Sequence, residues 1–339
     1  MEIAGRIKIE NETLEMMCFP ELVYVPATKG NAGGLYDCKG QAIPSAINHR
    51  GNISYLSGPI DNKIDINKLH LDNNVKSHFF IGDISPHFGH FLLESTSRLW
   101  PLLNKGENLT DLKYLYCSSN PNHGFFRKSF IKDIFGCFSL QAQEFVAYRE
   151  PCRIKNVFIA PPAFEIRHHS NVIFRQLMRH IGTSLAGNLD SINNANTTPL
   201  YLSKSKLTKG VSGITNEIEI EMLLKQEGVD ILHPETLSLE NQIKELTNRK
   251  YLIGFVGSAL HTLLFCPGDK VISGIVLGEK LNANYVMIDQ LARNKGHYEL
   301  AGNVNVVACD ESTPGFMRTF YANDPKLAAQ ILLKNILSV

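Results

Sequence analysis

The stretch YLIGFVGSALHTLLF, residues 251–265, contains the pattern that decides the fold. Residues 251–256 form an apolar run of strand length, and the small residues Gly257, Ser258 and Ala259 follow it directly. We expect these small residues to open a short helix that ends near Phe265. A strand that passes through a glycine-containing turn into a helix is a unit of an α/β fold, so the flanking sequence should repeat it.

The same alternation extends in both directions along the chain. On the C-terminal side, strands are predicted at 200–203, 229–232, 270–275 and 285–288, and helices at 216–227 and 238–248. On the N-terminal side, strands are predicted at 22–25, 77–81, 114–117, 145–148 and 157–160, and helices at 87–103, 124–135 and 170–182. Alternating strands and helices indicate parallel sheets in two Rossmann-like domains.

The polar run 187–199 separates the two blocks and has the composition of a linker. We therefore predict an N-terminal domain at 1–182, a linker at 183–199, and a C-terminal domain at 200–310. A tail at 311–339 follows, with a helix at 325–337 that Asp324 and Pro325 begin. This tail helix is expected to pack back on the N-terminal domain.

Composition excludes several classes of protein. The chain has 339 residues, 44% of them hydrophobic and 20% charged, as in ordinary globular proteins. A formal net charge of +1 gives no basic field for nucleic acid. Its 7 cysteines include no Cys-x-x-Cys pair, which favours reduced, mostly buried thiols. We find neither a signal peptide nor a membrane-spanning run, so a cytoplasmic protein is expected.

Residues 83–103 contain the candidate catalytic groups. His90, Glu94 and Arg98 are spaced by four, so a helix places a base, an acid and a cation on one face. A surface salt-bridge ladder has the same spacing. Here, however, the polar groups lie among aromatic residues and directly after a predicted strand, where open α/β sheets bind ligands.

The C-terminal domain offers a candidate phosphate site. The turn Gly257, Ser258 and Ala259 exposes backbone N–H groups at the start of a helix, which suits a pyrophosphate. A tight turn that needs small residues only for packing explains the same pattern equally well. The other candidates follow strands of the same domain or extend the turn: Ser203, Lys204, Lys206, Lys209, Glu235 and His261. The lysines would neutralise phosphate, Glu235 would accept a hydrogen bond from a ribose or sugar hydroxyl, and His261 would donate to phosphate.

With these motifs in place, the chain resembles glycosyltransferase family 61, a group common in bacterial capsule and surface-polysaccharide loci. Four pieces carry the resemblance, in order: FGHFLLESTSRLW at 88–100, YLSK at 201–204 followed by Asn216 and Glu217, HPETLSLENQI at 233–243, and the turn at 254–265. Lys204 stands where the family usually has arginine, so a bidentate phosphate contact becomes a point charge.

The resemblance implies a GT-B-type fold with two Rossmann-like domains facing an interdomain cleft. It further implies an inverting transferase that uses a nucleotide-sugar donor, a glycan or glycolipid acceptor and no obligatory metal or other cofactor. Under this hypothesis Glu94 is the base, His90 orients it or is itself the base, and Arg98 stabilises phosphate or holds Glu94. A peripheral contact with the inner face of the membrane is compatible with a lipid-linked acceptor.

Two other functions remain open from the residues alone. One is a metal-dependent hydrolase with His87, His90 and Glu94 as ligands, although their spacing is not His-x-x-x-His and no Asp-rich second cluster accompanies them. The other is a non-catalytic protein that binds a sugar nucleotide or glycan. Fold alone does not decide among these functions.

Overall fold

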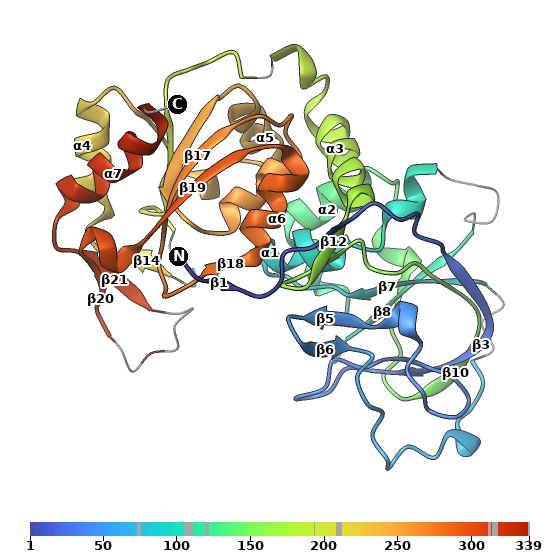
Figure 1. Cartoon of the computed structure of the whole chain (residues 1–339). Coiled ribbons are helices and arrows are strands. Elements are labelled where there is room, and N and C mark those ends of the chain that lie inside the picture. Colours follow the sequence, from blue (N-terminus) through green and yellow to red (C-terminus); the bar gives the residue numbers. More distant parts are fainter. Residues whose placement is uncertain are drawn as a thin grey trace. The chain divides into compact units, whose positions relative to one another are not determined.

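The computed structural model describes residues 1–72, 76–104, 111–118, 122–192, 194–207, 212–310, 313 and 318–337. It is a mixed α/β protein that divides into two compact units (Figure 1). The N-terminal unit is Gly5–His180, and the C-terminal unit combines Ile181–Val339 with Met1–Ala4. Helix α3 (Val172–Ala186) continues across the division, four residues beyond the predicted end of the first domain at 182.

The N-terminal unit is built on a mixed sheet. Among the described residues it has six strands in the order β4-β3-β10-β7-β8-β9. Strands β10, β7, β8 and β9 run parallel to one another, whereas β3 pairs antiparallel with both β10 and β4. The core of this sheet contains Phe80, Leu115 and Ile154, which are fully buried. The all-parallel sheet expected for a Rossmann-like domain is therefore extended here by two antiparallel strands.

The strands of the N-terminal unit are β2 (Ile9–Glu10), β3 (Met17–Val25), β4 (Gly34–Tyr36), β5 (Asn48–Arg50), β6 (Ile53–Leu56), β7 (His78–Asp83), β8 (Lys113–Cys117), β9 (Phe145–Val146), β10 (Cys152–Ile159), β11 (Phe164–Glu165) and β12 (His169–Asn171). Its helices and helical turns are η1 (Pro44–Ala46), η2 (Ile66–Lys68), α1 (Phe88–His90), η3 (Phe91–Ser95), η4 (Trp100–Asn104), η6 (Gly124–Arg127), α2 (Ser129–Gly136), η7 (Ala142–Glu144) and the start of α3.

The C-terminal unit is built on a parallel sheet with the order β15-β13-β16-β17-β19 in the described chain. In sequence order this is 2-1-3-4-5, a doubly wound arrangement whose connections change direction between β13 and β16. Figure 1 shows α4 and α7 on one side of β17 and β19, and α5 and α6 on the other. Tyr201, Ile253 and Ile275 belong to the core beneath α4 and α7.

The strands of this unit are β1 (Ile3–Ala4), β13 (Leu200–Leu202), β14 (Gly213–Ile214), β15 (Asp230–Leu232), β16 (Tyr251–Phe255), β17 (Val271–Val276), β18 (Leu281–Asn282), β19 (Lys295–Leu300), β20 (Val306–Ala308) and β21 (Thr319–Ala322). The helices and helical turns are η8 (Asp190–Ile192), α4 (Glu217–Gln226), η9 (Pro234–Thr236), α5 (Leu239–Thr247), η10 (Ser258–Leu264), α6 (Ala283–Ala292), η11 (Ala301–Val304) and α7 (Pro325–Leu337).

One predicted strand of the C-terminal unit is wrong. Residues 285–288 lie inside helix α6, and the fifth strand of the sheet is β19 instead. Asn282 caps α6, because its side chain accepts a hydrogen bond from the backbone N–H of Asn284 at 3.0 Å. A short apolar run does not distinguish a strand from a buried helix segment, and here the cap decides.

The tail helix α7 differs from the prediction in what it packs against. It lies on α4 and β17 within the C-terminal unit. Its start is as predicted, since Asp324 accepts a hydrogen bond from the backbone N–H of Leu327 at 2.9 Å. The predicted linker is also attached to this unit, because the side chain of Asn194 accepts from Lys270 Nζ at 2.9 Å and its backbone N–H donates to Thr247.

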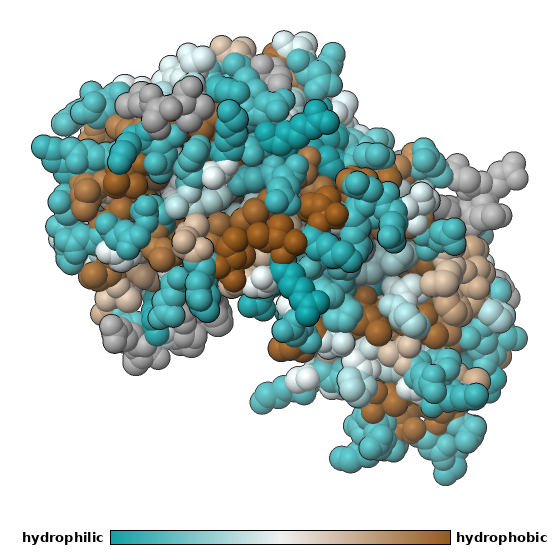
Figure 2. Space-filling view, in the orientation of Figure 1, coloured by the Kyte–Doolittle hydropathy of each residue, from teal (hydrophilic) through white to brown (hydrophobic). Residues whose placement is uncertain are grey.

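None of the seven cysteines forms a disulfide in the described structure. Cys117, Cys152 and Cys266 are buried, whereas Cys18, Cys38 and Cys309 are exposed and Cys137 is intermediate, so the expectation of mostly buried thiols is only half right. No helix in the described ranges is long and apolar enough to cross a membrane. On the face drawn in Figure 2, apolar side chains form several separate groups among hydrophilic ones.

Candidate functional site

The sequence predicts one regular helix at 87–103. The structure has helical turns in this segment, but they do not form one regular helix. Helix α1 is followed by a π-helical turn, η3, in which the backbone N–H of Thr96 donates to Phe91 at 3.2 Å. The Thr96 hydroxyl also donates to the carbonyl of Leu92 at 2.7 Å. A single π-helical turn inside a helix is frequent at functional sites, because it redirects the side chains on either side.

Glu94 on this turn is held by two partners. Its Oε1 accepts from Arg50 Nε at 2.5 Å, and its Oε2 accepts from Arg50 Nη2 at 2.8 Å and from His90 Nδ1 at 2.7 Å. Burial raises the pKa of Glu94, but the hydrogen bonds from His90 and Arg50 outweigh it and lower that pKa overall. Glu94 is therefore a paired carboxylate that fixes the ring of His90.

His90 is the group best placed to exchange a proton. Its Nδ1 lies on Glu94, its side chain is 40% exposed, and its Nε2 has no hydrogen-bond partner among the described residues. A carboxylate on Nδ1 sets the tautomer and leaves Nε2 as the acceptor for a proton. The ring of His87 lies 5.2 Å away, and burial lowers the pKa of His87.

A second carboxylate, Asp83, lies at the end of β7 beside this group. Its Oδ2 accepts from the Tyr55 hydroxyl at 3.0 Å, and the guanidinium of Arg50 lies 3.4 Å from the centre of the Tyr55 ring. Burial raises the pKa of Asp83. Arg50, Tyr55 and Asp83 were not among the predicted site residues, and only the position of Asp83 directly after a strand signalled it in the sequence.

Arg98 is not part of this reactive group. It is completely buried, and its five N–H groups donate to the carbonyls of Ser45, Ile47 and Ala160 and to the side chain of Asn48. Burial lowers the pKa of Arg98 to about 9, so the guanidinium is still charged at neutral pH. All of its donors are used within the N-terminal unit, so the predicted contacts with phosphate or Glu94 are absent in the described structure.

In the C-terminal unit, Lys204 and Gly257 meet at the point where the sheet changes direction. Lys204 follows β13 and Gly257 follows β16, two neighbouring parallel strands. A Cβ at Gly257 would lie 2.6 Å from Lys204 Nζ, so glycine is what lets the lysine lie over this turn. Nζ has one hydrogen bond among the described residues, a long one of 3.5 Å to the carbonyl of Val256. The ammonium is thus largely desolvated and weakly paired.

Glu217 supports this lysine from the start of α4. Its Oε1 accepts from the backbone N–H of Lys204 at 3.1 Å and from the Tyr201 hydroxyl at 2.8 Å. Burial lowers the pKa of Lys204 and raises that of Glu217. Neighbouring Asn216 has a separate role, because its side-chain amide exchanges two hydrogen bonds of 3.0 Å with the backbone of Ala322.

The other residues predicted to bind phosphate or sugar follow strands of the same sheet. Ser203 is buried, and its hydroxyl donates to Glu221 Oε1 at 2.5 Å. His233 Nε2 lies 3.3 Å from the same oxygen. Glu235 is exposed on η9 and Lys206 is also exposed. Lys209 lies outside the described residues.

The turn at residues 257–259 is partly exposed, but His261, the last residue predicted to contact phosphate, is buried. Ser258 and Ala259 begin η10, a helical turn of 7 residues, and are half-buried. His261 is buried, with its ring 5.3 Å from that of Tyr285. The turn therefore presents Gly257, Ser258 and Ala259 to a ligand, whereas His261 faces the protein interior.

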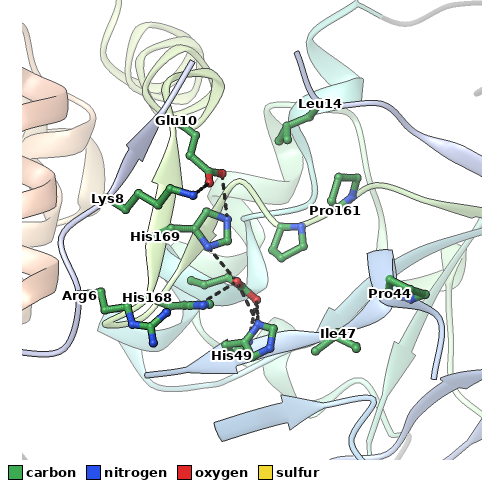
Figure 3. A pocket seen from close by; sticks show the side chains of 12 residues that line it. Arg6, Lys8, Glu10, Leu14, Pro44, Ile47, His49, Pro161, His168 and His169 are labelled. Carbon is green, nitrogen blue, oxygen red and sulfur yellow. Dashed lines mark hydrogen bonds and ion pairs between the residues drawn. The ribbon is translucent and has the colours of Figure 1, made fainter. Parts of the chain in front are cut away.

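A further cluster of ionisable groups lies in the N-terminal unit around Glu165. His49, Glu165 and His168 form the one group of three or more His, Cys, Asp or Glu residues that has metal-ligand spacing in the described structure. They line a cavity of about 350 Å³ (Figure 3). In the chain His49 is 116 residues from Glu165, so the sequence carried no local signal for the cluster.

The predicted ligand set His87, His90 and Glu94 is arranged differently. Both oxygens of Glu94 are occupied by Arg50 and His90, and the Arg50 guanidinium is already the cation beside that carboxylate. A metal ion bound to Glu94 would have to displace the positively charged guanidinium of Arg50. This arrangement therefore argues against a metal-dependent hydrolase with these three ligands.

Comparison with known proteins identifies one family. The family model described as Glycosyltransferase 61 matches residues 88–273, more than half of the chain. The match begins at Phe88 in α1 and ends at Ser273 in β17, so it includes His90, Glu94, Lys204 and the turn at Gly257. No curated protein matches the chain significantly.

Proposed function

The chain belongs to glycosyltransferase family 61, and we propose that it is an inverting transferase for a bacterial surface glycan. A hexose or pentose would move from a nucleotide-sugar donor to a hydroxyl of a capsule or lipopolysaccharide precursor. We further propose that the two units form a GT-B-type pair, and that the enzyme works in the cytoplasm, peripherally at the inner face of the membrane when its acceptor is lipid-linked.

The observation that carries this proposal is the state of Lys204. A half-buried ammonium whose one hydrogen bond among the described residues is 3.5 Å long is costly unless an anion completes its coordination. It lies at the switch point of a parallel sheet, where ligands of doubly wound folds bind. The diphosphate of a nucleotide sugar would provide that anion, and the start of η10 directly after Gly257 would offer it backbone N–H groups.

Proton transfer is assigned to the His90–Glu94 pair. In this mechanism the acceptor hydroxyl gives its proton to His90 Nε2 as its oxygen attacks the anomeric carbon, and the bond to the diphosphate breaks on the opposite side. Glu94 holds His90 through Nδ1 and stabilises the imidazolium that forms. Because Glu94 has a lowered pKa and a bidentate contact with Arg50, we assign it a positioning role rather than that of the base.

Charge on the leaving diphosphate is met by Lys204 and the Gly257 turn in place of a divalent ion. We therefore expect transfer that does not depend on added magnesium or manganese. A cavity of about 570 Å³ in the N-terminal unit, lined by Trp100, Asn104 and Gln176 among others, is our candidate for a part of the acceptor beyond its reacting hydroxyl. An indole beside side-chain amides suits a sugar, which offers an apolar ring face and hydroxyl groups.

The test is a screen of the purified protein against a panel of nucleotide sugars, including CMP-sugars, with magnesium and manganese omitted. Wild-type protein should bind and slowly hydrolyse one donor. His90→Gln and Glu94→Gln should keep donor binding and lose turnover, whereas Lys204→Ala should lose donor binding. If the wild-type protein binds a donor without hydrolysing it, the protein is a non-catalytic binder; if His90→Gln and Glu94→Gln hydrolyse the donor at the wild-type rate, another group is the base.

A further inference from the structure

We propose that His49, Glu165 and His168 form a binding site for one divalent transition-metal ion of the Zn²⁺ type, with a structural role in the N-terminal unit. This site is separate from the donor site and makes no use of the transfer chemistry. Figure 3 shows His49, His168 and His169 turned toward a common carboxylate at the wall of the cavity.

The distances fit a metal ion with nitrogen and oxygen ligands. His49 Nδ1 lies 3.1 Å from Glu165 Oε1, and His168 Nδ1 lies 3.7 Å from Glu165 Oε2. In a tetrahedral zinc site with bonds near 2.0–2.1 Å, neighbouring ligand atoms are about 3.3 Å apart. The three ligand atoms all lie within 4.8 Å of one another, so a small rotation of the partly exposed His49 ring closes the set.

The chemistry of the donors agrees with the geometry. Glu165 is 2% exposed, and its carboxylate offers oxygen ligands of the kind that Zn²⁺ takes. His168 Nδ1 is buried and has no hydrogen-bond partner among the described residues. A buried carboxylate beside a buried imidazole nitrogen that makes no hydrogen bond supplies the oxygen and nitrogen ligands that an ion of the Zn²⁺ type takes.

A supporting shell holds the carboxylate in place. The backbone N–H of His49 donates to Glu165 Oε1 at 2.6 Å, and His169 Nδ1 lies 3.0 Å from Glu165 Oε2. His169 in turn contacts Glu10 through Nε2 at 3.6 Å, which forms a carboxylate–histidine–carboxylate chain. Such outer contacts orient the ligands of metal sites. The adjoining cavity of about 350 Å³ leaves room for water as a further ligand and for entry of the ion.

The site joins two segments that are remote in sequence. Glu165 and His168 belong to the β11–β12 hairpin, in which Arg167 adopts a left-handed conformation with φ of 57°. His49 belongs to β5, whose next residue is Arg50. A metal at His49 therefore fixes the strand that presents Arg50 to Glu94, which explains how a structural ion would influence the candidate catalytic group without contacting it.

The experiment measures metal content and affinity in tag-free protein. After treatment with chelator, the protein is titrated with Zn²⁺ and with Co²⁺, and metal is measured by elemental analysis and visible absorption. We expect one equivalent of bound metal per chain and Co²⁺ absorption typical of nitrogen and oxygen ligands. Thiolate-to-Co²⁺ bands would instead indicate binding to the exposed Cys18, Cys38 or Cys309 and would overturn the assignment.

Single variants locate the site. His49→Ala and His168→Ala should weaken binding by about 100-fold or more, since loss of a ligand exceeds the effect of losing an outer contact. Exposed His70→Ala and the double variant His87→Ala/His90→Ala are the controls and should bind as wild type. Binding that survives His49→Ala and His168→Ala, or that disappears in the His87/His90 control, contradicts the proposal.

Loss of folding is separated from loss of a ligand by comparing far-ultraviolet circular dichroism of each variant with that of metal-free wild type. A variant that matches metal-free wild type but no longer binds Co²⁺ supports the site. Thermal unfolding adds an independent readout, because one equivalent of Zn²⁺ should raise the midpoint of wild type and not that of His168→Ala. Donor binding at Lys204 is unaffected by either outcome, so failure here leaves the proposed transferase function untouched.

Discussion

Replacing Arg98 by methionine tests whether this residue is structural or catalytic. The substitution leaves four acceptors in a fully buried region without their donors, namely the carbonyls of Ser45, Ile47 and Ala160 and the Asn48 amide oxygen. Orphaned buried acceptors cost about 1–3 kcal/mol each, and relief of the desolvated charge offsets part of the sum. We expect a net loss of about 3–5 kcal/mol in the free energy of unfolding, which is a large share of a typical total.

The assay is equilibrium unfolding in urea followed by tryptophan fluorescence. The chain has a single tryptophan, Trp100, two residues from Arg98. Its indole N–H donates to Pro161 at 3.0 Å, directly after the Ala160 carbonyl that Arg98 binds. The probe therefore reports on the region that the substitution disturbs. Arg98→Lys should fall between wild type and Arg98→Met, because an ammonium has three donors for the four acceptors.

The matched control is Arg153→Met in the same unit. Arg153 also contacts a partner through its guanidinium, but its side chain is 39% exposed and that of its partner Glu21 is 32% exposed. Partly exposed ion pairs contribute about 1 kcal/mol or less, so this variant should unfold close to wild type. An Arg98→Met protein that keeps the wild-type urea midpoint but loses turnover would refute the structural role and return Arg98 to the catalytic group.

Three further predictions concern the candidate sites. Gly257→Ala should preserve folding, because its Cβ meets the movable end of Lys204, yet weaken donor binding roughly tenfold by displacing that ammonium; calorimetric titration with the donor checks this. Glu94→Gln should lower turnover by about 10³–10⁴, as loss of an orienting carboxylate does in other histidine-dependent enzymes, and a donor affinity that falls in parallel would contradict the positioning role. Glu94 and Glu165 have folded-state pKa values below their unfolded value of 4.5, so the stability they contribute is present above that pH and is lost as pH falls through the folded values. Urea midpoints measured from pH 6 to pH 3 should therefore decrease, and a midpoint that rises toward acid would contradict this sign.

Several features were predictable because they depend on short stretches of chain. The strand, glycine turn and helix of residues 251–265 follow from local apolar runs and small residues, and they appear as β16 and η10. The sequence also placed Lys204 and Gly257 on one edge of a parallel sheet, since both follow strands of one alternating block. The structure brings them into contact at that edge.

Helical spacing was a weaker guide. His90 and Glu94 do meet as four-residue spacing predicts, because α1 and the first part of η3 keep one face. Arg98 does not join them, since the π-helical turn and the turn after it interrupt the regular helical spacing between Glu94 and Arg98. Residues 285–288 misled for a related reason: their apolar character is compatible with a strand or a buried helix, and a cap outside the run decides between the two.

The sequence by itself determined the α/β class, the family, the pairing of His90 with Glu94 and the edge shared by Lys204 and Gly257. Each of these depends on periodicity within a few residues or on strands of one regular block. Only the tertiary structure decided that β5 presents three successive residues to three charged groups: Asn48 to Arg98, His49 to Glu165 and Arg50 to Glu94. These partners are 44 to 116 residues apart in the chain, and contacts of that range depend on how strands pair and loops close rather than on any local pattern of residues.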